Sequence, residues 1–191
     1  MSTSAVVAMV VVVIAVAIVI AFVAKNQRSR RLRERFGPEY GRAVEQMGSA
    51  ARAEAKLEKL EKRVQGFKIR PLSPEARVDY LQAWHRIQAR FVDDPRSALT
   101  KADKLIQELM RDRGYPVAEF EQRAADISVD HPLVVEHYRA GHEISVRHSQ
   151  GQASTEDMRQ AMIHYRTLFA ELADEPELTR TGPPTAEGAR A

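Results

Sequence analysis

An uninterrupted run of twenty apolar residues, Ala5 to Ala24, constrains this chain more than any other feature. It contains nine Val, three Ile, six Ala, one Met and one Phe, and no polar side chain. A helix rises 1.5 Å per residue, so about 20 residues span about 30 Å, the hydrocarbon thickness of a bilayer. In lipid only a helix satisfies every backbone group within one segment. The run therefore predicts a transmembrane helix over residues 5–24, preceded by a short tail, residues 1–4.

A cleaved signal peptide is the competing interpretation of the apolar run. Such peptides have a basic leading segment and an apolar stretch of about 7–15 residues. Here residues 1–4 carry no basic side chain, the apolar run is longer, and a basic cluster follows it directly. Ala15-Val16-Ala17 resembles a cleavage motif but lies inside the run. We therefore expect an uncleaved, single-pass anchor.

The basic residues are distributed unevenly along the chain. Residues 25–35 carry six basic residues and one acidic residue, whereas the rest of the chain carries 23 basic and 25 acidic residues. The six are Lys25, Arg28, Arg30, Arg31, Arg33 and Arg35. Positive residues that flank a span stay on the cytoplasmic side, so we expect a plasma-membrane protein with its N-terminus outside and its soluble domain in the cytoplasm.

Two roles are open for this basic juxtamembrane segment, residues 25–36. It either determines topology alone or also binds anionic lipid headgroups, at about 1 kcal/mol per basic residue near the surface. A nucleic-acid-binding protein would carry its excess of positive charge on the folded domain instead. Nucleic acid is therefore not an expected partner.

Apolar residues recur at heptad-like spacing over residues 38–68. Successive apolar positions are three or four residues apart, as in a coiled coil. This pattern predicts one amphipathic stalk helix. The association seam consists of its strongest positions, Leu57, Leu60, Val64 and Phe67. The seam either binds a second copy or a partner protein, or folds back on the domain, and the pattern does not distinguish these alternatives.

Residues 73–173 are predicted to form a compact helical domain. Ser73-Pro74 and Asp94-Pro95 combine a capping side chain with a first-turn proline, which is typical of a helix start. Gly114 and Gly151 are predicted helix ends, and further helices are expected over about 117–127, 130–149 and 155–172. Residues 174–191 are polar and rich in Pro and Gly, which predicts a disordered tail. With no strand pattern anywhere, the expected fold class is all-α.

The chain contains no motif for catalysis, cofactor binding or metal binding. Cysteine is absent, which excludes thiol chemistry and Cys-based zinc sites. His142-Glu143 begins a zinc-protease HExxH pattern, but the second ligand position is Val146. A His-Tyr-Arg triplet occurs twice, at residues 137–139 and 164–166, and its tyrosines are interpreted as packing residues. We expect Trp84, the one tryptophan, in the core, and we expect no enzyme, cofactor or metal.

A set of short motifs is spread over the soluble part of the chain. They are Arg35-Phe36-Gly37-Pro38-Glu39-Tyr40, Arg70-Pro71-Leu72-Ser73-Pro74-Glu75, Arg90-Phe91-Val92-Asp93-Asp94-Pro95, Arg113-Gly114-Tyr115-Pro116, Phe120-Glu121-Gln122-Arg123-Ala124-Ala125-Asp126 and Val129-Asp130-His131-Pro132. Over residues 30–172 the chain resembles a family of uncharacterised bacterial proteins, mainly actinobacterial, described as hypothetical membrane or secreted proteins. No activity is known for that family, so the resemblance implies no site residues. Its secreted label conflicts with the orientation from charge, which we keep.

These features together predict a membrane-tethered, all-helical interaction or scaffold protein. A partner protein or a second copy would bind through the stalk. The alternative is an envelope stress protein or one that binds an anionic lipid surface through residues 25–35. A less expected alternative is an enzyme without a recognisable motif.

Overall fold

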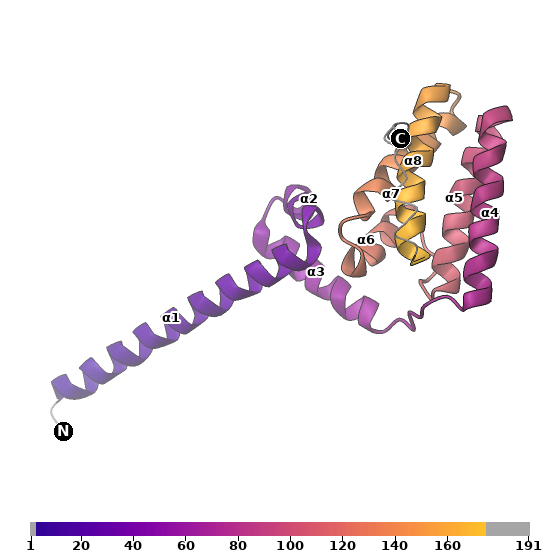
Figure 1. Ribbon diagram of the computed structural model, residues 1–191. Helices are drawn as coiled ribbons and strands as arrows, with labels where there is room; N and C mark the ends of the chain where they lie inside the picture. Colours follow the sequence, from indigo (N-terminus) through magenta and orange to yellow (C-terminus); the bar gives the residue numbers. More distant parts are fainter. Residues whose placement is uncertain (1–2, 175–191) are drawn as a thin grey trace, which may run out of the picture. The chain divides into compact units, whose positions relative to one another are not determined.

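The computed structural model describes residues 3–174, and over this range the chain is all-α, which confirms the predicted fold class. Eight helices are described, and the chain divides into two compact units, residues 1–59 and residues 60–191 (Figure 1). Most of the predicted tail over residues 174–191 lies outside the described residues, as do residues 1 and 2 of the predicted tail over residues 1–4.

The first unit begins with one continuous helix, α1 (Thr3–Phe36), which includes the apolar run and the basic juxtamembrane segment. The apolar side chains described in the run remain exposed, from 46% for Val23 to 69% for Phe22. Among the described residues, α1 is the one helix long and apolar enough to cross a membrane, although a signal sequence shares these properties. The helix continues beyond the apolar run to Phe36 and ends before Gly37, which has a positive φ of 48°.

Two shorter helices complete the first unit, and they correct the expectation of one stalk helix over residues 38–68. α2 (Pro38–Met47) ends at Gly48, and α3 (Ala50–Gln65) begins two residues later. Gly48 adopts a left-handed conformation with φ of 63°, which costs glycine little because it lacks a Cβ atom. Six apolar side chains of the first unit are buried: Leu32, Phe36, Tyr40, Ala43, Ala53 and Leu57.

The second unit contains the last turns of α3 and five further helices. These are α4 (Pro74–Asp93), α5 (Pro95–Asp112), α6 (Phe120–Asp130), α7 (Val135–Ser149) and α8 (Thr155–Leu172). Ser73 and Asp94 each accept a hydrogen bond from the third backbone N–H after them, which confirms both predicted starts. Ser154 and Asp157 form a capping box at α8. α6 begins three residues later than predicted, because residues 117–119 are not helical. α7 begins five residues later than predicted, because residues 131–134 form a turn between the two helices.

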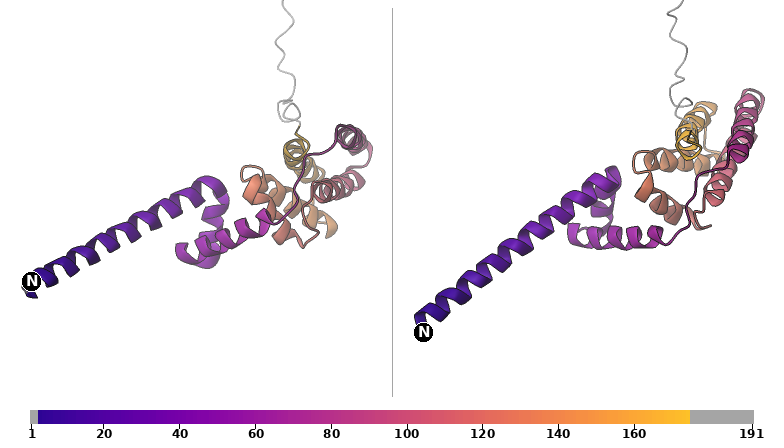
Figure 2. Two further views of the ribbon diagram at one scale, coloured as in Figure 1. Left: turned by 90° about the horizontal axis from the view of Figure 1, so that it is seen from below. Right: turned by 60° about the horizontal axis from the view of Figure 1, so that its bottom comes forward.

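The helices of the second unit pack mainly as two hairpins. α4 packs along α5, α7 packs along α8, and α5 contacts both helices of the second hairpin, while α6 packs on α7 (Figures 1 and 2). Trp84 on α4 is fully buried and stacks on Phe169 of α8, with ring centroids 4.8 Å apart. Its predicted place in the core is therefore confirmed, and it joins the two hairpins.

Tyr165 of α8 occupies the centre of this core. Its side chain is fully buried, and its hydroxyl donates a 2.8 Å hydrogen bond to Asp103 of α5. Its ring lies against Gly141 of α7 so closely that a Cβ atom there would be 2.8 Å from the tyrosine Cε1. Glycine at residue 141 is thus what lets α7 and α8 approach each other around this ring.

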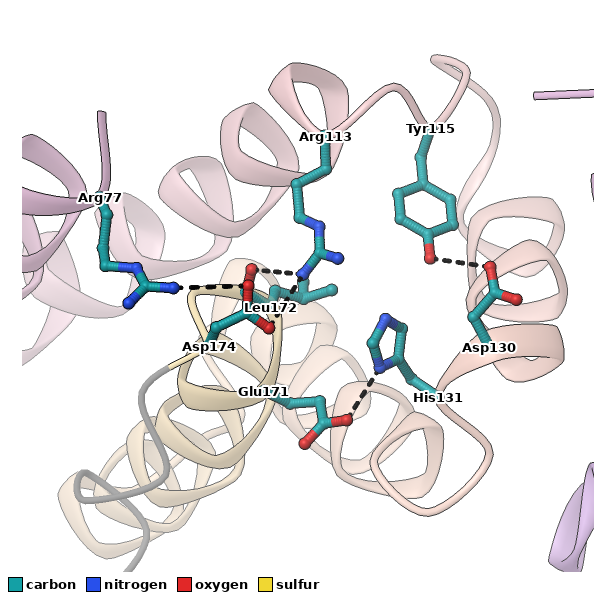
Figure 3. Close-up of polar contacts among 8 residues, drawn as sticks. All are labelled: Arg77, Arg113, Tyr115, Asp130, His131, Glu171, Leu172 and Asp174. Atoms are coloured by element: carbon teal, nitrogen blue, oxygen red, sulfur yellow. Dashed lines mark hydrogen bonds and ion pairs between the residues drawn. The ribbon is translucent and has the colours of Figure 1, made fainter. Parts of the chain in front are cut away.

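A network of polar contacts surrounds the C-terminal end of α8 (Figure 3). The buried Arg113 side chain donates a 2.7 Å hydrogen bond to the Leu172 carbonyl, one of the carbonyls that a helix end leaves unpaired. On the neighbouring α6–α7 turn, His131 lies 2.9 Å from Glu171. The chain segment before α4 also reaches this end of α5, where the Arg70 N–H donates to the Arg113 carbonyl. These contacts connect the ends of α5 and α8 with the two adjoining loops.

Replacing Gly141 with alanine should destabilise the second unit. The added Cβ would overlap the Tyr165 ring, which is buried and hydrogen-bonded, and such overpacking costs about 1–3 kcal/mol. This exceeds the gain of about 0.5–1 kcal/mol that alanine brings to a helix interior. Urea unfolding followed by Trp84 fluorescence measures the loss. Gly41→Ala, where the added Cβ meets no atom within 4 Å, serves as the control. It lies on α2 of the first unit, so it should not lower the midpoint of the Trp84 transition, which reports on the second unit. Equal midpoints for Gly141→Ala and the wild type would contradict the close contact.

Candidate interaction surfaces

All six basic residues of the juxtamembrane segment lie on the last turns of α1 and are exposed. The Arg28 guanidinium forms an ion pair with Glu58 of α3, with 2.6 Å between Nε and Oε1. The Arg33 guanidinium lies 5.2 Å from the centre of the Tyr40 ring on α2. Arg31 and Arg35 also interact with other groups. At least four of the six therefore take part in contacts within the protein as well as facing solvent.

Glu54 of α3 is the buried polar centre of the first unit. Its carboxylate accepts a 2.6 Å hydrogen bond from the Ser29 hydroxyl of α1 and a 2.9 Å bond from the Tyr40 hydroxyl of α2. The Ser29 hydrogen bond lowers the pKa of Glu54, burial opposes this, and the Tyr40 bond and nearby Arg28 add to the lowering. One carboxylate thus connects all three helices of this unit.

The four residues of the association seam are divided between the two units. Leu57 is buried in the first unit, at 4% exposure, and Val64 is buried in the second, at 5%. Leu60 is half-buried, and Phe67 is half-buried against the core of the second unit. Association through this seam would therefore require Leu57 and Val64 to leave packing that they already have within the chain.

Two histidines that are 27 residues apart in sequence meet between α7 and α8. His137 Nδ1 lies 2.9 Å from His164 Nδ1, so one ring donates and the other accepts, and at least one imidazole is neutral. Burial and the neighbouring His137 lower the pKa of His164. Both histidines belong to the repeated His-Tyr-Arg triplet. The tyrosines of that triplet, Tyr138 and Tyr165, are both fully buried, as expected.

His142, the first residue of the incomplete zinc-protease pattern, packs on an aromatic ring. Phe120 of α6 stacks on its imidazole with centroids 3.6 Å apart, and burial lowers the pKa of His142. Among the described residues, no three side chains of the types that bind metals lie close enough together to hold an ion. The expectation of a protein without a metal or a catalytic site stays a prediction.

A groove of about 430 Å³ lies between α4 and α5, and sequence patterns did not single it out. The groove cations are Arg86 and Arg90 from α4, and Lys101 and Lys104 from α5. Its apolar floor consists of Ala83, Ile87 and Leu105, and Glu108 is the one acidic residue in its lining. In the sequence, each pair of cations has the spacing of an ordinary solvent-exposed face of an amphipathic helix. The two pairs come together only because α4 packs on α5.

Replacing Glu54 with glutamine should lower the stability of the first unit by about 1–2 kcal/mol. The Ser29 and Tyr40 hydroxyls would then donate to a neutral amide instead of a charged carboxylate, and such hydrogen bonds are weaker. Since folding lowers the pKa of this carboxyl, its contribution is fully present above the ordinary value of 4.5 and is lost as pH falls through the lowered value. The chain has no cysteine, so spin labels at Gln27→Cys and Lys59→Cys can report the distance between α1 and α3.

The wild type should give a narrow distance distribution at neutral pH and a broad one in acid, below the lowered pKa of Glu54. Glu54→Gln should broaden it at neutral pH. Glu45→Gln, at an exposed position of α2, is the matched control and should behave as the wild type does. Identical distributions in all three chains at neutral pH would show that Glu54 does not hold the unit together.

The resemblance to uncharacterised bacterial proteins stays a prediction. So does its implication that no activity is known for proteins of this kind. The functional arguments that follow therefore rest on the residues and contacts of this chain. Comparison with protein-family models, curated proteins and solved structures found no match.

Proposed function

We propose that this protein is a membrane-tethered interaction module, with α1 as its anchor and the second unit as its binding part. The observation that carries the proposal is the exposure of the apolar side chains of α1. Val11 to Val23 form an apolar surface that no other part of the described chain covers, and such a surface is stable only against lipid or another protein.

The length of α1 supports lipid as the covering material. Its apolar run alone matches the thickness of a bilayer, and the basic residues follow within the same helix. A basic cluster directly after a span favours the cytoplasmic side for the residues that follow it. We therefore propose a single-pass protein of the plasma membrane, with its N-terminus outside and its folded units in the cytoplasm.

The charged groups exposed in the α4–α5 groove of the second unit favour an interaction role over catalysis. The charged groups that the groove offers to solvent are mostly unpaired cations on helix faces, which suits binding of an acidic partner. A catalytic site would instead bring an acid, a base or a nucleophile together in a deep pocket. The proposal is accordingly a scaffold or adaptor without enzymatic activity.

Binding of an anionic lipid surface is the second proposal for residues 25–35. All six basic side chains are exposed, as headgroup contacts require. Four of them, however, also have partners within the protein, including Glu58 for Arg28 and Tyr40 for Arg33. Because these contacts satisfy part of their charge, we rank lipid binding below the interaction role.

Two arginines placed in the apolar run, Val13→Arg with Ala17→Arg, should abolish anchoring. Each arginine at the centre of a span costs about 2.5–3.5 kcal/mol of insertion free energy. The measurement is the fraction of the chain that stays in the membrane pellet after alkaline carbonate extraction. Asn26→Arg with Gln27→Arg adds the same charge to α1 outside the apolar run, and this control should stay in the pellet.

The intact mass of the extracted wild-type protein separates an anchor from a signal peptide. An uncleaved anchor gives the mass of the whole sequence. A mass that lacks the apolar run, or complete extraction of the wild type by carbonate, would refute anchoring by α1.

A further inference from the structure

The α4–α5 groove concentrates positive charge on a unit whose charges balance as a whole. Residues 60–174 contain 17 basic and 18 acidic residues, whereas the lining of the groove contains four basic residues and one acidic residue. Arg86, Arg90 and Lys101 make no side-chain hydrogen bond or ion pair with the rest of the described chain, and Lys104 lies 3.8 Å from Glu108. Like charges gathered without partners repel one another, so an anionic ligand gains their combined attraction.

The shape and floor of the groove indicate what kind of anion fits. α4 and α5 run side by side as a hairpin (Figures 1 and 2). The lining of the groove extends from Ala83 to Arg90 on α4 and from Lys101 to Glu108 on α5, which is about two helical turns along each helix. A groove between two packed helices is the kind of surface on which an amphipathic helix docks. Arg86 and Arg90 are four residues apart, and Lys101 and Lys104 are three apart, so each pair lies on one helix face. Acidic residues at the same spacing on a docked helix would therefore face them.

The apolar floor favours a peptide over a nucleic acid. Ala83, Ile87 and Leu105 contribute alkyl surface against which an aliphatic side chain can pack. Protein surfaces that bind single-stranded nucleic acid use aromatic side chains as stacking platforms, and the lining of this groove has none. The charge balance of the whole unit also differs from the basic surface expected for nucleic-acid binding.

We propose that the α4–α5 groove binds an acidic amphipathic helix of a partner protein. The carboxylates of the helix pair with the groove cations, and its apolar side chains contact the floor. This inference rests on the proposed interaction role and names the chemistry of the partner, but it does not depend on whether α1 crosses a membrane. Ion pairs at an exposed rim are individually weak, so affinity comes from several acting together and falls with salt.

The test uses the full chain in nanodiscs of zwitterionic lipid. The probe is a fluorescein-labelled amphipathic helical peptide with leucines on one face and glutamates on the other, and binding is followed by fluorescence anisotropy. The wild type should bind it saturably and more weakly as salt rises. Arg86→Gln with Arg90→Gln and Lys101→Gln should weaken binding about tenfold or more, because three exposed ion pairs are lost.

The matched control removes three exposed basic residues of the same unit outside the groove. It carries Lys62→Gln, Lys68→Gln and Arg96→Gln, and its net charge equals that of the groove variant. This control should bind the peptide as the wild type does. Because all six positions are exposed, both variants should keep the wild-type Trp84 unfolding transition, which shows that a loss of binding is not a loss of fold.

Several results would overturn the proposal. Equal weakening in the groove variant and the control would mean that net charge alone is measured. Equal binding of a peptide with lysine in place of glutamate, or no saturable binding to the wild type, would exclude an acidic helix as the ligand. So would a single-stranded RNA that binds through the groove cations more tightly than the peptide. Carbonate extraction is independent of all these outcomes, so failure of peptide binding and failure of anchoring are distinguishable.

Discussion

The contact of the Tyr165 ring with Gly141 is the constraint on which the second unit depends. One side chain of α8 fills the space that the missing Cβ leaves on α7, and its hydroxyl bonds to Asp103 of α5. Asp103 also accepts a 2.7 Å hydrogen bond from Gln107, so its carboxylate has a partner for each oxygen. Burial and the Asp103 carboxylate raise the pKa of Tyr165 above its ordinary value, so the phenol that donates this hydrogen bond stays protonated well into the alkaline range. Three helices are thereby fixed, and α5 carries one wall of the α4–α5 groove.

In the first unit, too, one buried side chain holds three helices together, and here it is a carboxylate. Glu54 is almost fully buried, and a buried carboxylate is stable only when hydrogen bonds or opposite charges replace its water. Ser29 and Tyr40 provide the hydrogen bonds, and Arg28 and Lys25 provide the positive charge. The basic residues that favour one orientation across a membrane thus also stabilise the fold of the three helices. The fold of the first unit therefore depends on the same segment, residues 25–36, that we propose orients the chain in a membrane.

Local signals made much of the helical architecture predictable. A capping side chain and a proline act within one turn, so Ser73 and Asp94 marked the starts of α4 and α5 correctly. Gly114, with φ of 98°, lies two residues after the end of α5, near the predicted stop. The apolar run predicted a helix over its own residues, and the absence of strand patterns predicted the all-α fold. Each of these features is decided by neighbours in sequence.

The features that the sequence did not reveal depend on packing between distant segments. The break at Gly48 was missed because the apolar positions on either side of it, Met47 and Ala50, keep the spacing of a heptad. The His137–His164 pair joins two helices, and neither residue marks the other in sequence. The groove was missed for the same reason, since its four cations come in two pairs that only the α4–α5 hairpin unites.

Membrane topology is the measurement that tests the proposed function most directly. Reporter fusions after Ala191, one active only in the cytoplasm and one active only outside, place the end of the chain on one side of the membrane. If α1 crosses the membrane with residues 25–35 on the cytoplasmic side, as we propose, only the cytoplasmic reporter should be active. Activity of the external reporter alone would contradict this orientation and place the α4–α5 groove, and any partner of it, outside the cytoplasm.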